Sequence, residues 1–371
     1  MHNPFEKNPD LESMLEVVRE FCADQAGEPV VRRIMENPEG FDRSLWQRLG
    51  QELGILGLGA PERLGGLGLG VADQAALMEA LGAALMPGPL IGTLALAMPA
   101  LGAVQDHSVQ SRYLPSLISG DMTAAFAVPD HGGRFFPQAV EITAREEAGE
   151  WLLDGSIDHV VDAPIADLFI VAGRDAHGVH LWSVEKEVSG LSIQPEPVMD
   201  LTRRQGNLQL QSCRALKIVD QVEVEAVCNR AFLVAGALLA SEQAGAAGRI
   251  LDVTIDYVAN RVQFGRTIGS FQAIKHRCAD LLVAVEHARS VARHAAWAID
   301  EQDPDAAVHV AVARSICSDA FYQLATVSIQ LLGGIGFTWE HPAHLYLKRA
   351  IGDSLLLGTA RQQRELIAAY L

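Results

Sequence analysis

The C-terminal part of the chain carries three long segments in which apolar residues recur at helical spacing. They read CNRAFLVAGALLASEQAGAAGRILDVTIDYVANR, AIKHRCADLLVAVEHARSVARHAAWAID and AAVHVAVARSICSDAFYQLATVSIQLL. Each is roughly thirty residues long and has one apolar stripe, which is typical of a helix that buries one face. Helices of this length predict a helical bundle over residues 226–371, and the Ala and Gly content of the first would let neighbours approach it closely.

The pattern changes twice before the bundle. Residues 1–120 have helical spacing of apolar positions interrupted by Gly and Pro clusters, which predicts an N-terminal helical domain. Residues 121–225 contain short runs such as TAAFAV, DLFIVAGR and VHLWSV, separated by Asp, Gly and Pro, which is typical of antiparallel strands. The sequence therefore predicts a mainly α protein with a central β domain.

Charge and hydropathy exclude some partners. Lys and Arg total 29 against 46 Asp and Glu, and a net charge of −17 argues against binding to nucleic acid or to an anionic membrane surface. The most apolar run, LMPGPLIGTLALAMPALGAV, is broken by three prolines. We therefore interpret it as core helices rather than as a membrane span.

The five cysteines are scattered and show no C-x-x-C spacing, which indicates buried thiols in a reducing cytoplasm rather than disulfides or a zinc site. The first residues, MHNPFEKNPD, do not have the basic-then-apolar pattern of a signal peptide. We expect a cytoplasmic protein without a bound metal.

Two stretches at helix junctions are rich in donors. In RVQFGRTIGSFQ, the guanidinium groups of Arg261 and Arg266 match phosphate oxygens, although a helix-capping loop with solvated arginines has the same composition. In QLLGGIGF, Gly333, Gly334 and Gly336 follow a long helix, where backbone N–H groups can approach a ligand or the turn can simply end the helix.

Together these stretches, in a helix–β–helix order, resemble the acyl-CoA dehydrogenase family over essentially the whole chain. The resemblance implies three domains: an N-terminal helical domain, a middle antiparallel β-barrel and a C-terminal four-helix bundle. It also implies that the arginine loop reaches the FAD pyrophosphate of a neighbouring subunit and that the glycine segment lies near the adenosine half. The residues that it assigns to the cofactor there are Arg261, Phe264, Gln272, Gln330, Gly333 and Gly334.

Weaker matches extend the resemblance. PERLGGLGLG is similar to a Pro-Glu-x-x-Gly-Gly segment of the family, and Gly358-Thr359 is similar to a Gly-Thr pair near the flavin diphosphate, so Thr359 is a further expected FAD contact. GFTWEHPAHLYLKRA resembles a bacterial subgroup that acts on bulky CoA thioesters, including steroid side chains. Turns, caps and subunit packing are the alternative interpretations of these segments.

The chain departs from the family at the flavin ring. Where the family has Thr-Glu-Pro followed by Gly-Ser, this chain has VPDHGG, and where the family has Trp-Ile-Ser/Thr it has HVVDAP. The aromatic residue that shields the flavin is therefore missing. Backbone groups of residues 127–129 and 160–162 are the expected replacements, and Val161 and Asp162 would lie at the ring.

The catalytic base is the second departure. The family removes an α-proton from the thioester and passes the β-hydrogen as hydride to flavin N5, so a carboxylate must face the flavin. The usual position before the Gly-Thr pair is Leu357, and an alternative family position falls at Ala235. Glu242 lies two helical turns further along on an apolar face, where desolvation would raise its pKa. It is the predicted base, with an ion pair to Arg249 as the alternative.

Two functions of different class follow from the resemblance. The first is FAD-dependent α,β-dehydrogenation of an acyl-CoA thioester, with electrons passed to electron-transfer flavoprotein. The second is a non-catalytic or half-site subunit that lends FAD-binding residues to a partner chain. A flavin-fold monooxygenase or nitroalkane oxidase is a distant third. The expected assembly is a homotetramer or an α2β2 heterotetramer with a related subunit, and the acyl group is not defined.

Overall fold

The computed structural model describes residues 9–370, which form two compact units. We call the first the bundle unit; it contains residues 9–32, 71–86 and 236–370. The second, the barrel unit, contains residues 33–70 and 87–235. The 40-residue helix α7, Gln221–Asn260, contributes to both. These units cut across the predicted N-terminal domain, because its helices are divided between them.

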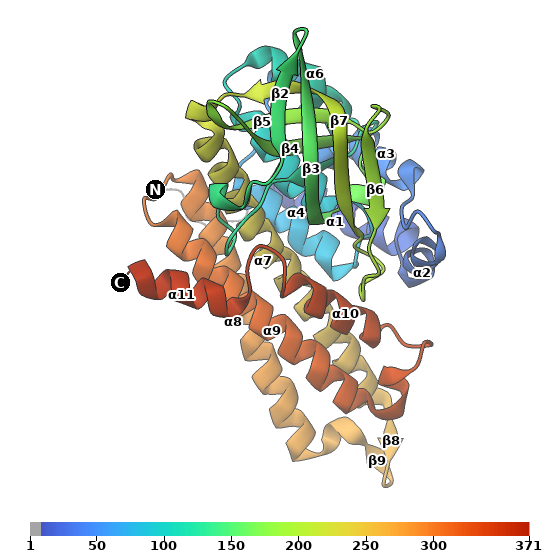
Figure 1. The fold of residues 1–371 in the computed structure, drawn as a ribbon. Coiled ribbons are helices and arrows are strands. Elements are labelled where there is room, and N and C mark those ends of the chain that lie inside the picture. The colour runs from blue at the N-terminus through green and yellow to red at the C-terminus, as the bar shows by residue number, and fades with distance from the viewer. Residues whose placement is uncertain (1–8, 371) are drawn as a thin grey trace. The chain divides into compact units, whose positions relative to one another are not determined.

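The bundle unit is built from long helices, as the apolar periodicity predicts. α8 and α9 are joined by a short turn and pack against each other, and Figure 1 shows them running in opposite directions. The other helices of this unit are shorter, apart from its share of α7. Their bounds are α1 Pro9–Gln25, α4 Val71–Ala83, α8 Gln272–Asp300, α9 Ala306–Leu332, α10 Ala343–Asp353 and α11 Ala360–Tyr370; α2, Glu28–Glu36, begins in this unit.

Glycines allow α4 and α7 to cross at very short range. A Cβ on Gly245 would lie 1.9 Å from the Glu79 carbonyl oxygen, and a Cβ on Gly82 would lie 2.2 Å from that of Glu242. Only hydrogen atoms fit at these two positions, which confirms that the small residues of the first bundle helix permit close approach. The start of α4 is also tied to α8, because the Asp300 carboxylate accepts hydrogen bonds from the Val71 and Ala72 N–H groups.

The barrel unit contains a seven-stranded sheet closed on itself. Strands β4, β2, β3, β7 and β5 follow one another and β5 pairs back with β4, while β1 and β6 pair with β4 and β7. Most pairs are antiparallel, as predicted, but β1 and β2 are parallel to β4. The strands are β1 Ala124–Ala127, β2 Thr143–Glu147, β3 Glu150–Val161, β4 Leu168–Asp175, β5 Gly178–Glu185, β6 Leu191–Pro195 and β7 Gln205–Val219.

Alternating apolar side chains fill the inside of this barrel. Phe169 on β4 lies opposite Val184 on β5, and both belong to one buried cluster with Trp182 and Leu208. The helices of the unit are α3 Arg43–Gln51, α5 Met98–Ala103 and α6 His107–Ile118. Shorter helical turns are η1 Ile55–Gly57, η2 Glu62–Leu64, η4 Pro137–Ala139 and η5 Ala163–Ile165, and η3, Leu90–Ala97, is a buried π-helix.

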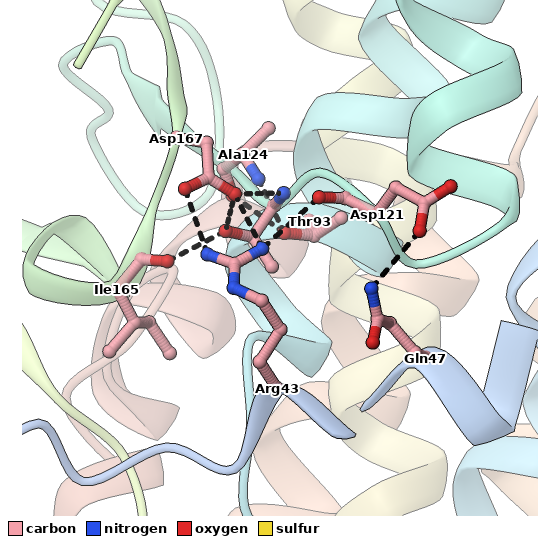
Figure 2. Close-up of polar contacts among 8 residues, drawn as sticks. Arg43, Gln47, Thr93, Asp121, Ala124, Ile165 and Asp167 are labelled. Atoms are coloured by element: carbon pink, nitrogen blue, oxygen red, sulfur yellow. Dashed lines mark hydrogen bonds and ion pairs between the residues drawn. The ribbon is translucent and has the colours of Figure 1, made fainter. Parts of the chain in front are cut away.

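A polar cluster joins α3 to the start of β1 and β4 (Figure 2). The guanidinium of Arg43 donates two hydrogen bonds to the Asp167 carboxylate, at 2.9 and 2.8 Å. The same carboxylate accepts from the Thr123 N–H and hydroxyl, and the Thr93 hydroxyl exchanges hydrogen bonds with the Ala124 backbone. This cluster fixes the strand segment next to residues 127–129, which the sequence assigns to the flavin.

These elements confirm the predicted fold class. Two helices, α7 and the stretch 306–337, are by length and composition apolar enough to cross a membrane. The apolar window of α7 is 72% buried and that of 306–337 is 39% buried, and core helices of globular proteins pass the same test. All five cysteines are free thiols, and burial raises the pKa of Cys22 and Cys213 to about 11.

Candidate flavin-binding and catalytic site

The arginine loop is a small hairpin between α7 and α8. β8, Val262–Gln263, pairs with β9, Arg266–Thr267, through a turn at Phe264 and Gly265, whose φ angles are 54° and 74°. Positive φ at both turn residues matches the twist of a tight hairpin. Phe264 is 90% exposed, and a short turn, η6 Ile268–Ser270, leads into α8. The hairpin therefore holds its tip in solvent.

The donors of this loop differ in whether they have partners within the chain. Across residues 9–370 the exposed guanidinium of Arg261 has no hydrogen-bond or ion-pair partner, although its backbone is fixed by bonds to Tyr257 and Ile268. Arg266 instead lies over the Phe271 ring, 3.9 Å from its centroid. The predicted contact Gln272 begins α8 and is hydrogen bonded to His276 at 3.0 Å. A rigid backbone thus presents a free guanidinium.

The glycine segment follows α9. Gly333 has φ 66° and ends the helix, and η7, Gly333–Phe337, continues from it. A Cβ added at Gly333 or Gly334 would meet nothing within 4 Å, so open space lies beside both residues. Gln330 is exposed one turn earlier, and Phe337 is 81% exposed.

These two segments lie at the same end of the bundle. α7 and α9 both run toward this end and α8 runs away from it, so the β8–β9 hairpin and the segment after α9 both lie there (Figure 1). Arg261 has no partner in the described residues, and open space lies beside Gly333 and Gly334. The Gly333 N–H donates to the Gln330 and Ile329 carbonyls, so the guanidinium, rather than this N–H, is the donor suited to a diphosphate.

Thr359 lies elsewhere in the bundle unit. The turn before it contacts Arg314 on α9. Arg314 lies sixteen residues before Gln330 on this helix, so about 24 Å of helix axis separates the two residues. The Thr359 N–H and hydroxyl share the Gln362 side-chain oxygen at 2.9 and 3.0 Å, and the Gly358 N–H has no hydrogen-bond partner in the described part of the chain. The expected FAD contacts of the bundle unit thus form two separate groups.

Glu242 is fully buried. Its carboxylate Oε1 accepts a hydrogen bond from Nη1 of Arg349 on α10, and both side chains are only 1% exposed. A contacting guanidinium favours the ionised carboxylate and opposes the effect of burial. The sequence suggested Arg249 as the alternative partner, but the arginine in contact is a hundred residues further along the chain.

Val161 and Asp162 end β3 in the barrel unit. Asp162 is fully buried and has φ 62°, and its Oδ2 accepts a hydrogen bond of 2.8 Å from the Gly92 N–H of the π-helix. Its own N–H donates to the Arg204 carbonyl at 2.8 Å. Val161 is half-buried. The Asp162 side chain therefore holds η3 against the end of β3.

Sequence reasoning missed a buried polar network around Glu242. The neighbouring residue Gln243 accepts a hydrogen bond of 2.6 Å from Nη1 of Arg314, and both are buried. One signal was available: adjacent polar residues on an otherwise apolar helix require partners, and arginines occur in several other bundle helices. Nothing in the sequence says which arginine meets which residue. Among residues 9–370 no three His, Cys, Asp or Glu side chains are arranged to hold a metal ion.

Two family models match the chain. The acyl-CoA dehydrogenase N-terminal domain matches residues 8–121 and the C-terminal domain matches residues 226–371. The chain belongs to the acyl-CoA dehydrogenase family, whose members are flavoprotein oxidoreductases. The acyl-CoA dehydrogenase IpdE2 of Mycobacterium tuberculosis is 37% identical over 358 residues, which cover 95% of each chain.

Solved structures agree with this assignment. A Tcur3481–Tcur3483 steroid acyl-CoA dehydrogenase variant is 26% identical with a TM-score of 0.85, and 97% of each chain is covered. The ChsE4–ChsE5 complex of M. tuberculosis is 28% identical with a TM-score of 0.88, covering 98% of each chain. PigA, solved with FAD and proline, is 25% identical with a TM-score of 0.89, covering 99% of this chain and 98% of PigA.

Proposed function

We propose that this chain takes part in the FAD-dependent α,β-dehydrogenation of an acyl-CoA thioester. The observation that carries the proposal is the set of exposed residues at one end of the bundle, where Arg261 has no partner in the described chain and open space lies beside Gly333 and Gly334. In a member of this family, exposed residues of this kind would bind the FAD of a neighbouring subunit. The acyl group is bulky, by similarity to the steroid acyl-CoA dehydrogenase.

The residues present fit a bound FAD. Arg261 would hold the diphosphate by a charge-assisted hydrogen bond, and Gln330 with Gly333 and Gly334 would admit the adenosine half. Thr359 and the free Gly358 N–H would meet a second diphosphate, because the bundle keeps them far from Arg261. Phe264 and Gln272 would flank the first. The half-buried Val161 would lie at the flavin ring, and the fully buried Asp162 would act there through its hydrogen bond to Gly92. When bound, FAD supplies the hydride acceptor.

Glu242 remains the proposed base, under one condition. It must exchange its contact with Arg349 for the α-proton of the substrate, because a carboxylate held in a buried ion pair is a weaker base. Transfer of the α-proton to Glu242 would leave negative charge at the α-carbon, and the β-hydrogen would leave as hydride to the acceptor that bound FAD supplies. This requirement is specific and can be tested by mutation.

The same ion pair favours a second candidate function. If Glu242 serves only to balance Arg349, the chain has Leu357 and Ala235 at the family's base positions and no carboxylate of its own there. It would then be a half-site subunit in an α2β2 assembly with a related chain. The ChsE4–ChsE5 complex is a solved assembly of two named family chains. A homotetramer is the corresponding assembly for the first function.

The electron acceptor and the location remain predictions. We expect electron-transfer flavoprotein to receive the electrons and the protein to act in the cytoplasm. The free and mostly buried thiols support a reducing compartment such as the cytoplasm.

The experiment that separates the two functions starts with the visible spectrum of the protein purified alone. A yellow flavin band supports the first function, and a colourless protein that gains flavin only when a related subunit is added supports the second. A protein that stays colourless with every related subunit contradicts both.

Substitution of Glu242 then tests the base. In Glu242→Gln, substrate-dependent bleaching of bound flavin should fall by a factor of about 10² to 10⁴ in anaerobic stopped flow. Arg349→Lys is the matched control, since it keeps the charge of the pair. Rates are expressed per bound flavin, so that loss of folded protein does not imitate loss of the base. An unchanged rate in Glu242→Gln removes Glu242 from the reaction.

A further inference from the structure

The turn between α10 and α11 contains a strained residue. Leu357 is a non-glycine residue with φ 52°, and Gly358 follows with φ 86°. A branched side chain in the left-handed region is unfavourable, and such residues persist where the surroundings fix them. The Leu357 side chain is buried, and the next two residues are the free Gly358 N–H and Thr359.

Buried side chains hold the carbonyl groups on both sides of this strained bond. Nη2 of Arg314 donates to the Leu356 carbonyl at 2.8 Å and to the Asp353 carbonyl at 3.3 Å. Nε2 of Gln363 donates to the Leu357 carbonyl at 2.8 Å. The turn is therefore fixed from α9 on one side and from α11 on the other.

Arg314 is itself fixed from α7. Its Nη1 donates to Oε1 of Gln243, which leaves the Gln243 Nε2 buried with no hydrogen-bond partner in the described residues. Arg314 is 1% exposed. Burial of a guanidinium is costly, and this one is held to α7 through Nη1 while Nη2 donates to two carbonyls of the turn.

We propose that Arg314 is a positioning residue for cofactor binding. It holds the Leu357–Gly358 turn in its left-handed form, so that the Gly358 N–H and Thr359 are kept ready for the diphosphate of a dinucleotide. The identity of that ligand as FAD rests on the proposed function, but the role of Arg314 in fixing the turn is independent of it.

The test compares Arg314→Lys with Arg364→Lys. Lysine keeps the charge but loses the fork that reaches two carbonyls and Gln243, whereas Arg364 forms an exposed ion pair with Asp319 on the surface. Deuterium exchange of amides 355–362 is measured on the free protein. The FAD dissociation constant and midpoint potential are measured on the assembly that holds FAD, whether this chain alone or with a partner subunit.

We expect exchange in this segment to become about tenfold faster and FAD binding to weaken about tenfold in Arg314→Lys, with a shifted potential and no change in Arg364→Lys. Adding Leu357→Gly to Arg314→Lys removes the strain and should restore most of the affinity. If Arg314→Lys fails to fold, Gln363→Leu tests the same turn from α11.

Unchanged exchange in a folded Arg314→Lys overturns the proposal, as does faster exchange without any change in affinity or potential when FAD is bound. If the unmodified protein holds no FAD in any assembly, the proposed function fails. In that case, faster exchange in Arg314→Lys would still show that Arg314 fixes the turn, and unchanged exchange would show that it does not.

Discussion

Two regions of the bundle unit carry arginines in opposite circumstances. In the interior, Arg314 and Arg349 are at most 1% exposed, and each donates to an adjacent residue of α7. At the end of the bundle, Arg261 has no partner within residues 9–370, and Gly333 and Gly334 have open space beside them. The two buried guanidinium groups donate within the chain, whereas that of Arg261 is left for another molecule.

The difference shows how the same residue type takes different roles. A buried guanidinium must be paired because desolvation is costly, so its removal should be felt as lost folding stability. An exposed guanidinium is hydrated when free, so its removal should be felt only when its ligand binds. Each prediction below changes one side of this comparison while a matched substitution leaves it intact.

The largest expected effect is on stability, in Arg349→Met. Removal of the guanidinium leaves the Glu242 carboxylate buried without its ion-pair partner, which should lower the free energy of unfolding by about 3–5 kcal/mol. The measurement is equilibrium denaturation in urea. Arg364→Met removes an exposed ion pair with Asp319 and should cost no more than about 1 kcal/mol.

A double substitution sharpens this result. If the loss in Arg349→Met comes from the unpaired carboxylate, adding Glu242→Gln should recover part of it, because a neutral amide is less costly to bury. Additive losses in the double variant would show that the two side chains are not coupled.

The next effect is on cofactor binding, in Arg261→Ala. Loss of a charge-assisted hydrogen bond should weaken FAD binding by about 1.5–3 kcal/mol, while the unfolding free energy stays within about 0.5 kcal/mol of the unmodified protein. Flavin content per protein after gel filtration measures the effect. Arg361→Ala, which removes an exposed arginine on α11, is the control. Full flavin occupancy in Arg261→Ala would contradict the role of the loop.

Glycines give a third comparison between the packed interior and the open end. Gly245→Ala places a methyl group against the Glu79 backbone, so overpacking of about 1–3 kcal/mol should exceed the helix-propensity gain of about 1 kcal/mol. Gly248→Ala, on the same helix, meets the flexible end of Arg289 and lies at ordinary van der Waals distance, 3.7 Å, from Val285, and Gly334→Ala meets nothing within 4 Å. Thermal unfolding should show a lower Tm for Gly245→Ala alone.

The contrast also explains what the sequence could predict. Helical periodicity located α7, α8 and α9, and alternation located the barrel strands, because burial of one face imposes a period on a single segment. The partners of Glu242 and Gln243 could not be predicted, because they lie on α10 and α9, far along the chain. The parallel pairing of β1 with β4 was missed for the same reason. Arg261 and Gly333 could be proposed from the sequence because they belong to local motifs, and their contacts with FAD stay a prediction.

The smallest expected effect is the pH dependence of stability that His344 causes. This side chain is half-buried, between the buried arginines of the interior and the exposed Arg261. Burial, followed by the positive charges of Lys348, Arg32 and His341, lowers the pKa of His344 to about 4, and its Nε2 is buried without a hydrogen-bond partner in the described chain. The unfolded chain binds this proton at about pH 6.5, so between pH 6.5 and 4 it holds more protons than the folded chain. Stability should therefore fall as the pH is lowered through this window, by about 1 kcal/mol once solvent screening of this half-buried group is allowed for.

Urea denaturation from pH 7 to 4 measures this effect. The loss of stability should be shallower in His344→Gln than in the unmodified protein. Equal slopes would mean that His344 is protonated as easily in the folded chain as in the unfolded one.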